Sequence, residues 1–393
     1  MSRRMLIGLL VPLLICCSFG NGMAPLLPVY ALRVGASQVV AGWYTAFSFL
    51  CLAVGSLLAG RAGGFLQRRA FLVPFMLLAI PLTILMGRVT AVWQLTVLTG
   101  VNWLGGGILW TGVTIIASRH ALESERGRIF GMIGVVAGAG SIIGGLGIGT
   151  LVDRFGYSVM FLVVAGCYLL VPLVLMLLPR VPVERIAAPS GPRGTPAAAP
   201  RIGRAAFLVL GAQLIAFIAN GAGQLGRSLL MNVRGFPAAA ITSTSVVGAL
   251  VALPVPFVLG WLSDRVGRRA ILIACYACGA GALALLLASR VLWQFWVVGM
   301  LLAVLGVSVS IGMAFIADLV PASRVGAAMS LFQAAFYLGS VAGMSALVPA
   351  AGAIGMPGAL AAASGAAAIS VAVLLFVRRP HAAAGSAPAV TPP

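Results

Sequence analysis

The chain has 393 residues, of which 61% are hydrophobic and 8% are charged. Soluble domains carry about 25% charged residues, so this composition excludes a soluble fold and favours a chain that lies within a bilayer. The net charge of +19 comes from arginines between apolar runs. Membrane orientation explains them better than nucleic-acid binding, which needs a basic face on a soluble module.

Apolar runs near 20 residues recur along the chain, each long enough to cross a membrane as a helix. The start of the first run resembles a signal peptide, but no small-x-small cleavage site follows, so we expect an uncleaved first helix. The pattern predicts twelve spans, at residues 5–32, 38–60, 70–88, 91–118, 128–151, 157–178, 205–232, 240–262, 270–289, 293–317, 325–349 and 354–377.

Two segments are not apolar. Residues 179–204, rich in Pro, Gly and Ala, predict a flexible cytoplasmic linker between six-helix halves at 1–178 and 205–379. Residues 380–393 predict a disordered cytoplasmic tail. With the N-terminus inside, most arginines fall in cytoplasmic loops, which predicts that both termini are cytoplasmic.

Two spans carry unusual glycine and proline patterns. The first reads Gly-Asn-Gly at residues 20–22 and then has Pro25 and Pro28, which break backbone hydrogen bonds. This predicts either a simple kink or a functional pattern. The fifth has glycines at spacings of three and four, including the run Gly-Ser-Ile-Ile-Gly-Gly at 140–145, which allows close helix contact.

The loop after the eighth span changes abruptly from apolar to charged. Residues 260–269 read Gly-Trp-Leu-Ser-Asp-Arg-Val-Gly-Arg-Arg, and Gly267 permits a tight turn. Asp264 is expected to pair with the nearby arginines or to cap the next helix. A degenerate copy at residues 60–69 keeps the first Gly and the Arg pair, with Gly64 in place of the Asp. Recurrence at half the chain length predicts two related halves.

This loop resembles the G-x-x-x-D-R-x-G-R-R signature of the major facilitator superfamily. The resemblance covers nearly the whole chain. It implies an all-α integral membrane fold, with twelve transmembrane helices in two pseudo-symmetric six-helix halves that alternate access to a central site.

The first and fifth spans resemble signatures of twelve-helix bacterial drug exporters, G-x-G-x-x-x-P-x-x-P and G-P-x-x-G-G. Ser141 replaces the hallmark proline of the second signature. Residues 101–107 keep the glycines of the exporter pattern R-x-x-x-G-x-G but lack its Arg.

The family's cavity-lining helices carry neutral polar and aromatic side chains in this chain. The substrate-cavity candidates are Asn21, Tyr44, Asn102, Trp103, Trp110, Gln213, Asn220, Gln224, Gln333 and Tyr337. The alternative for each is an interhelical hydrogen bond. Arg227 would attract an anion, but we favour snorkelling to the outer interface.

The family's gating logic implies a role for the charged loop. The gating residues are Gly260, Asp264, Arg265, Gly267, Arg268 and Arg269, together with Arg128. Asp264 would contact the positive N-terminal end of the fifth helix near Arg128 and hold the outward-open state.

No acid lies inside a predicted span, and His120 and His381 lie outside the spans, so carboxylate-based proton antiport is unsupported. The same shortage disfavours a membrane enzyme. Cys275 and Cys278 have metal-site spacing without a second pair, so we expect buried cysteines and neither metal nor cofactor.

The sequence therefore predicts a transporter of the bacterial cytoplasmic (inner) membrane that exports a small apolar or amphipathic compound. The alternative is uptake or facilitated diffusion of a neutral solute such as a sugar; a non-transporting receptor or scaffold is a third possibility. We expect a monomer whose partners are its substrate and the lipid bilayer, with no nucleic acid.

Overall fold

The computed structural model describes residues 3–61, 69–120, 126–176, 203–321 and 325–377. Every regular element in these ranges is helical. The elements are α1 (Arg3–Met23), η1 (Ala24–Leu26), α2 (Leu27–Arg33), α3 (Gln38–Arg61), α4 (Arg69–Met86), α5 (Val92–His120), α6 (Arg126–Tyr168), α7 (Leu170–Leu175), α8 (Arg204–Val233), α9 (Ala238–Ala252), α10 (Val255–Val266), α11 (Arg268–Ala288), α12 (Leu292–Leu319) and α13 (Val325–Leu375).

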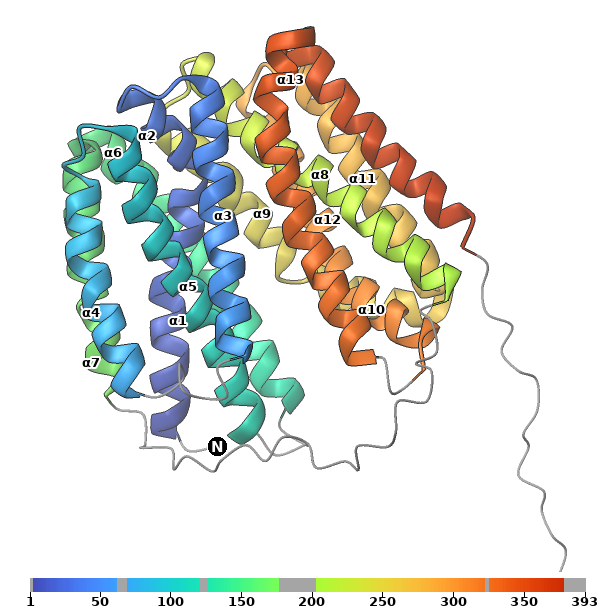
Figure 1. Cartoon of the computed structure of the whole chain (residues 1–393), viewed down its shortest axis with the longest axis horizontal. Helices are drawn as coiled ribbons and strands as arrows, with labels where there is room; N and C mark the ends of the chain where they lie inside the picture. The colour runs from blue at the N-terminus through green and yellow to red at the C-terminus, as the bar shows by residue number, and fades with distance from the viewer. Residues whose placement is uncertain (1–2, 62–68, 121–125, 177–202, 322–324, 378–393) are drawn as a thin grey trace, which may run out of the picture.

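Within the described ranges, seven helices are long and apolar enough to cross a membrane, and the bent pair α9–α10 adds an eighth. Two of the seven, α6 and α13, have 43 and 51 residues and contain non-helical glycines at 156 and 355, with φ of 79° and 75°. The chain reverses at each glycine, so each of these helices supplies two crossings (Figure 1). With α4 and α5, the order of helices fits the twelve predicted spans, and the predicted all-α membrane fold is confirmed.

Prolines break two of the spans. A 3₁₀ turn at Ala24–Leu26 interrupts the first span, beside Pro25 and Pro28, as predicted for residues that lack an N–H donor. The eighth span, predicted as one run at residues 240–262, bends by 42° between α9 and α10. Pro254 and Pro256 stand at this bend, so the same loss of backbone donors accounts for it.

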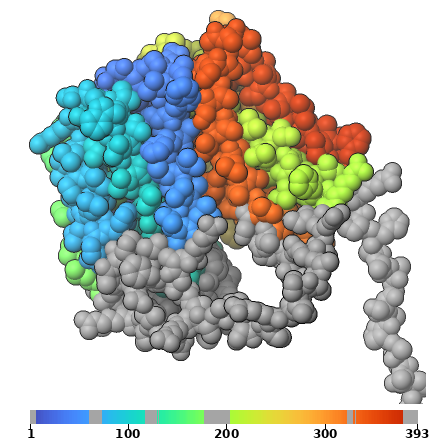
Figure 2. Space-filling model, in the orientation of Figure 1, coloured from blue at the N-terminus to red at the C-terminus, as the bar shows by residue number. Residues whose placement is uncertain are grey.

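The helices gather in two groups, α1–α7 and α8–α13, which we call the N-terminal and C-terminal groups (Figure 1). The groups meet where α3 lies beside α13 and where α6 lies beside α9. In the space-filling view, α3 (blue) and α13 (orange) form a continuous seam (Figure 2). One cluster of buried apolar side chains extends across both groups, so the seam is part of the core.

We call the end of the bundle where α2 ends and α3 begins the distal end, and the opposite end, where α1 begins, the near end. Close packing between the groups lies toward the distal end. Gly42 of α3 faces the Met344 carbonyl and Val348 of α13, and Gly149 of α6 faces Ala238 of α9. Toward the near end, α10 packs against α9, α11 and α12 of its own group.

Several predicted features lie outside the described residues. They are the terminal tail, nearly all of the linker, and the central part of the degenerate first-half loop.

Candidate functional site

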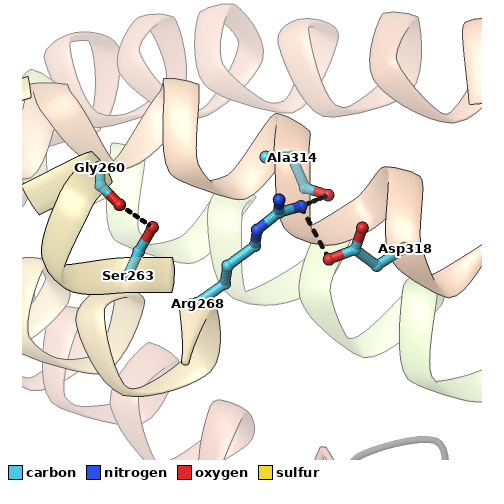
Figure 3. A network of polar contacts seen from close by, with 5 residues as sticks. All are labelled: Gly260, Ser263, Arg268, Ala314 and Asp318. Carbon is cyan, nitrogen blue, oxygen red and sulfur yellow. Dashed lines mark hydrogen bonds and ion pairs between the residues drawn. The ribbon is translucent and has the colours of Figure 1, made fainter. Parts of the chain in front are cut away.

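The charged loop between α10 and α11 turns at one glycine. Helix α10 ends at Val266, and Gly267 has φ of 102°, a backbone conformation that favours glycine. Helix α11 begins at Arg268, so the predicted tight turn at Gly267 is confirmed. Ser263 donates to the Gly260 carbonyl oxygen at 2.7 Å in the last turns of α10 (Figure 3).

The arginines of this loop bind the ends of two other helices. Arg268 donates to the carbonyl oxygen of Ala314 and to the carboxylate of Asp318, both at 2.7 Å, near the end of α12 (Figure 3). Arg269 donates to the carbonyl oxygen of Leu374, at 2.9 Å, at the end of α13. The carbonyl of Leu374 is among the last of α13, and such carbonyls lack partners within their helix. The loop therefore fastens α12 and α13 to the start of α11.

Arg265 lies over the ring of Trp261, with its guanidinium carbon 3.9 Å from the ring centroid. Such a cation–π contact holds the side chain against its own helix. The sequence predicted Asp264 as the partner of the loop arginines, whereas Arg268 pairs with Asp318. A carboxylate in the last turn of α12 was the available signal.

Asp264 differs from both local expectations. Its side chain is exposed, and within the described residues it forms neither a hydrogen bond nor an ion pair. Arg268 is already paired with Asp318, and the N-cap of α11 is Gly267, without a side-chain bond. The side chain of Arg128 lies outside the described residues, so its contact with Asp264 stays a prediction.

A carboxylate of the N-terminal group contacts the C-terminal group at the distal end. Asp153 of α6 accepts hydrogen bonds from the backbone N–H groups of Ala238 and Ala239, both at 2.8 Å. These two residues open α9, whose N-cap residue, Pro237, makes no side-chain cap bond. The N-terminal end of a helix attracts negative charge. Asp153 therefore caps, from the other group, a helix that lacks a cap of its own.

The helix that follows the corresponding turn of the N-terminal group, α3, has a capping residue of its own. Gly35 and Gly235 both have positive φ, 99° and 75°, in turns placed 200 residues apart. After the first turn, Ser37 accepts a hydrogen bond from the N–H of Val40 at 3.3 Å and caps α3. A proline stands at the equivalent position before α9. A comparison of Ser37 with Pro237 in the sequence would have shown that α9 lacks a cap of its own and needs an acceptor such as Asp153 from elsewhere.

Among the cavity candidates of the N-terminal group, two contact neighbouring spans through hydrogen bonds and remain accessible. Asn21 of α1 is exposed and donates to the hydroxyl of Ser141 on α6 at 2.7 Å. Asn102 of α5 donates to Thr83 of α4 at 2.9 Å. Asn102 also lines a small pocket with Trp103, formed by α1, α4, α5 and α6.

The other two candidates of this group differ in burial. Trp110 of α5 is 39% exposed. Tyr44 of α3 is 2% exposed, and its hydroxyl lies 3.0 Å from the hydroxyl of Thr99 on α5. Tyr44 thus makes the interhelical hydrogen bond that was its alternative role.

In the C-terminal group, three candidates lie along α8. Gln213 is fully buried and accepts a hydrogen bond from the hydroxyl of Tyr276 on α11 at 2.6 Å. Asn220 is half-buried, and its Oδ1 has no hydrogen-bond partner. Gln224 accepts a hydrogen bond from Arg227 at 2.8 Å. Two more candidates, Gln333 and Tyr337, are half-buried on α13.

Arg227 does not snorkel, and that expectation was wrong. Its side chain is 4% exposed, and Arg227 lies about two turns before the end of α8 at Val233. The guanidinium points between α9 and α12, beside Gly299 and the carbonyl of Thr244. Hydrophobic patterning gave no sign of this burial, because a single Arg near a helix end is typical of snorkelling.

Comparison with protein-family models identifies the family to which the chain belongs. The model of the Major Facilitator Superfamily matches residues 10–311 and again residues 230–392. The chain belongs to the major facilitator superfamily. Its all-helical membrane fold is consistent with this membership.

Several solved structures share the fold of this superfamily member at low sequence identity. A mutant of the nucleoside transporter NupG has a TM-score of 0.76 and 12% identity, over 94% of this chain and 99% of that one. The POT family transporter PepTSo gives 0.74 and 13%, over 96% and 98%. A mutant of the peptide transporter POT gives 0.72 and 15%, over 94% and 93%. No curated protein sequence matches the chain.

The glycine-rich α6 of this superfamily member packs against two neighbours. A side chain at Gly144 would overlap the Ser18 carbonyl of α1, and one at Gly140 would lie 2.9 Å from the Leu14 carbonyl. Gly145, by contrast, faces α9 of the other group, with the Thr242 carbonyl 3.1 Å from an added Cβ. The predicted close contact through these glycines is confirmed, and α6 serves both its own group and the seam.

Proposed function

We propose that the protein is a secondary transporter that works by alternating access and exports a small apolar or amphipathic compound. Its two moving parts would be the six-helix halves at residues 1–178 and 205–379, joined by the linker 179–204. The observation that carries this proposal is the distal seam. Two carboxylate hydrogen bonds and close glycine contacts join the groups there, and such contacts separate and re-form without unfolding either group.

The predicted topology assigns the distal seam to one side of the membrane. With both termini cytoplasmic, the distal end faces outward, and the described conformation is closed toward the outside. Asp153 would then hold the outer ends of the two groups together in the inward-facing state. Asp264 would take the reciprocal role in the outward-facing state, through the predicted contact with the N-terminal end of α6 near Arg128, where a carboxylate would again meet a helix N-terminus.

For the substrate site we propose the accessible polar and aromatic side chains of α1, α5, α8 and α13. Asn21 and Asn220 hold comparable places in the two halves, as the repeat predicts for a site at the midplane. The proposed lining comprises Asn21, Asn102, Trp103, Trp110, Asn220, Gln224, Gln333 and Tyr337. Amide and aromatic groups suit a largely apolar compound with a few polar atoms. We assign Tyr44 and Gln213 to positioning, through their bonds to Thr99 and Tyr276.

The alternative function is uptake or facilitated diffusion of a neutral solute such as a sugar. One observation favours it: each described acid lies near a helix end, at Asp153, Asp264 and Asp318, away from the middle of a span. Proton coupling usually uses carboxylates or histidines within the membrane.

Flux in proteoliposomes separates the two functions. The purified chain would be reconstituted, and movement of a lipophilic dye and of a neutral sugar measured with and without a pH gradient. Gradient-dependent dye movement supports export. Sugar equilibration that ignores the gradient supports the facilitator, and movement of neither compound contradicts both functions.

A further inference from the structure

Helix α8 carries a polar stripe formed by Asn220, Gln224 and Arg227, whose spacings of four and three place them on one face. Arg227 is incompletely paired. Its Nη2 donates to Oε1 of Gln224 at 2.8 Å, but its Nε is buried without an acceptor. Asn220 leaves a buried Oδ1 without a donor on the same stripe. The stripe therefore offers both a free donor and a free acceptor inside the bundle.

No described carboxylate neutralises Arg227. Asp153 caps α9, Asp264 is exposed, and Asp318 is paired with Arg268. A guanidinium keeps its proton in proteins, so its charge persists when the side chain is buried. An uncompensated buried charge is strongly unfavourable. An anion that reaches this face of α8 would be attracted by the positive charge of Arg227 and would accept a hydrogen bond from its free Nε–H.

The neighbouring helices leave room for the guanidinium. A Cβ added at Gly299 of α12 would lie 3.1 Å from Nη1 of Arg227 and 2.7 Å from the Thr244 carbonyl of α9. Only a residue without a side chain leaves both groups undisturbed. One turn earlier on α12, the indole N–H of Trp296 donates to the hydroxyl of Ser243 at 2.8 Å and holds α9 and α12 together. The packing thus keeps Arg227 in a defined place.

We propose that Arg227 binds the anionic group of the transported compound, which makes the substrate class an amphipathic organic anion such as an aromatic carboxylate. This inference rests on the proposed transport function. A guanidinium pairs with a carboxylate through two parallel N–H donors. Gln224 positions the guanidinium, and Asn220, two turns from Arg227, accepts a hydrogen bond from a polar group elsewhere on the compound.

The test compares two probes of the same shape, 2-naphthoate and its neutral amide 2-naphthamide. Binding is measured by calorimetry on the purified full chain in an uncharged detergent at neutral pH. The wild type should bind naphthoate roughly tenfold more tightly, the ratio expected from one charge-assisted hydrogen bond. Arg227→Gln should remove the preference, and Arg227→Lys should restore part of it.

Two matched controls separate the site from general effects. Arg234→Gln removes an exposed Arg just beyond the end of α8 and should leave the preference intact. Gly299→Ala should weaken naphthoate binding by crowding Arg227. Gly306→Ala on the same helix has open space around it and should not. This glycine pair tests the site even if Arg227→Gln does not fold.

Equal affinity of the wild type for both probes would overturn the inference, as would a preference that survives Arg227→Gln. Stabilisation by chloride that depends on Arg227, without any preference for naphthoate, would assign the site to an inorganic anion and also overturn it. Dye flux keeps the two proposals distinct. Dye transport without a naphthoate preference defeats this inference alone, and naphthoate binding without any flux defeats the transport function.

Discussion

At the scale of single residues, Asp153 replaces a missing helix cap. Its carboxylate accepts hydrogen bonds from two backbone N–H groups at the start of α9, where Pro237 supplies no side-chain acceptor. Charge-assisted caps contribute about 1–2 kcal/mol each. Here the cap and the bond between the groups are the same interaction, so loss of the charge should loosen the distal seam.

We expect Asp153→Asn to shift the population toward the outward-open state, because an amide offers one acceptor oxygen in place of two. Val348, 4% exposed at the seam, is the reporter position. With Val348→Cys in a background without native cysteines, labelling by an external, membrane-impermeant maleimide should rise roughly five- to thirtyfold. Arg154→Gln, one residue along, is the control. Unchanged labelling would show that the bonds of Asp153 do not hold the seam.

Pro237→Ser gives an independent test of the same contact. A serine there would cap α9 locally, as Ser37 caps α3, and would compete with Asp153 for the N–H groups. The variant should fold at least as stably as the wild type yet label faster at Val348→Cys. Slower labelling would contradict the role of Asp153 as a bond between the groups.

The arginines of the loop after α10 make contacts of unequal strength. The carboxylate of Asp318 is partly exposed, and exposed ion pairs contribute little. Arg268→Ala loses both the ion pair and the bond to the Ala314 carbonyl, so we expect a loss of about 1 kcal/mol in the free energy of unfolding. Asp318→Asn keeps the carbonyl bond and should lose less than half as much. Denaturant unfolding in detergent measures both, and equal losses would contradict this ranking.

At the scale of the elements, glycines decide which helices approach closely. The Ser18 carbonyl of α1 occupies the place of a side chain at Gly144, whereas the space around Gly147 of the same helix is open. We expect Gly144→Ala to destabilise the fold by about 1–3 kcal/mol through overpacking, and Gly147→Ala to be neutral or slightly stabilising. Similar melting temperatures for the two variants would contradict the packing account.

The elements themselves were largely predictable from the sequence. Apolar run length sets the spans, since a bilayer fixes how long a helix must be. The helix breaks at Pro25, Pro28 and Gly267 were predicted correctly because the backbone constraints of these residues are local. The bend at Pro254 and Pro256 was not predicted, although these prolines impose the same local constraint.

The side-chain contacts were less predictable, because they depend on which helices become neighbours. Tyr44 and Gln213 are neutral polar residues like Asn21, yet the structure buries them, whereas Asn21 is exposed. Arg227 was placed at the interface, although α9 and α12 bury it. The cap by Asp153 links residues 85 and 86 positions apart, beyond the reach of local pattern.

At the scale of the whole molecule, two helix groups share one seam toward the distal end, along α3 and α13 and along α6 and α9. Alternating access requires this seam to open while each group keeps its own fold. The first group has a buried cluster of its own, built from α1, α3, α4, α5, α6 and α7, which suits movement as a unit.

The central claim is that opening of the distal seam is a step of transport. Asp153→Cys combined with Ala239→Cys would place two thiols across the seam. In proteoliposomes, oxidative cross-linking of this pair should stop dye flux, and reduction should restore it, while either single cysteine variant should be insensitive to oxidation. Flux that continues at the same rate through the cross-linked protein would contradict the account.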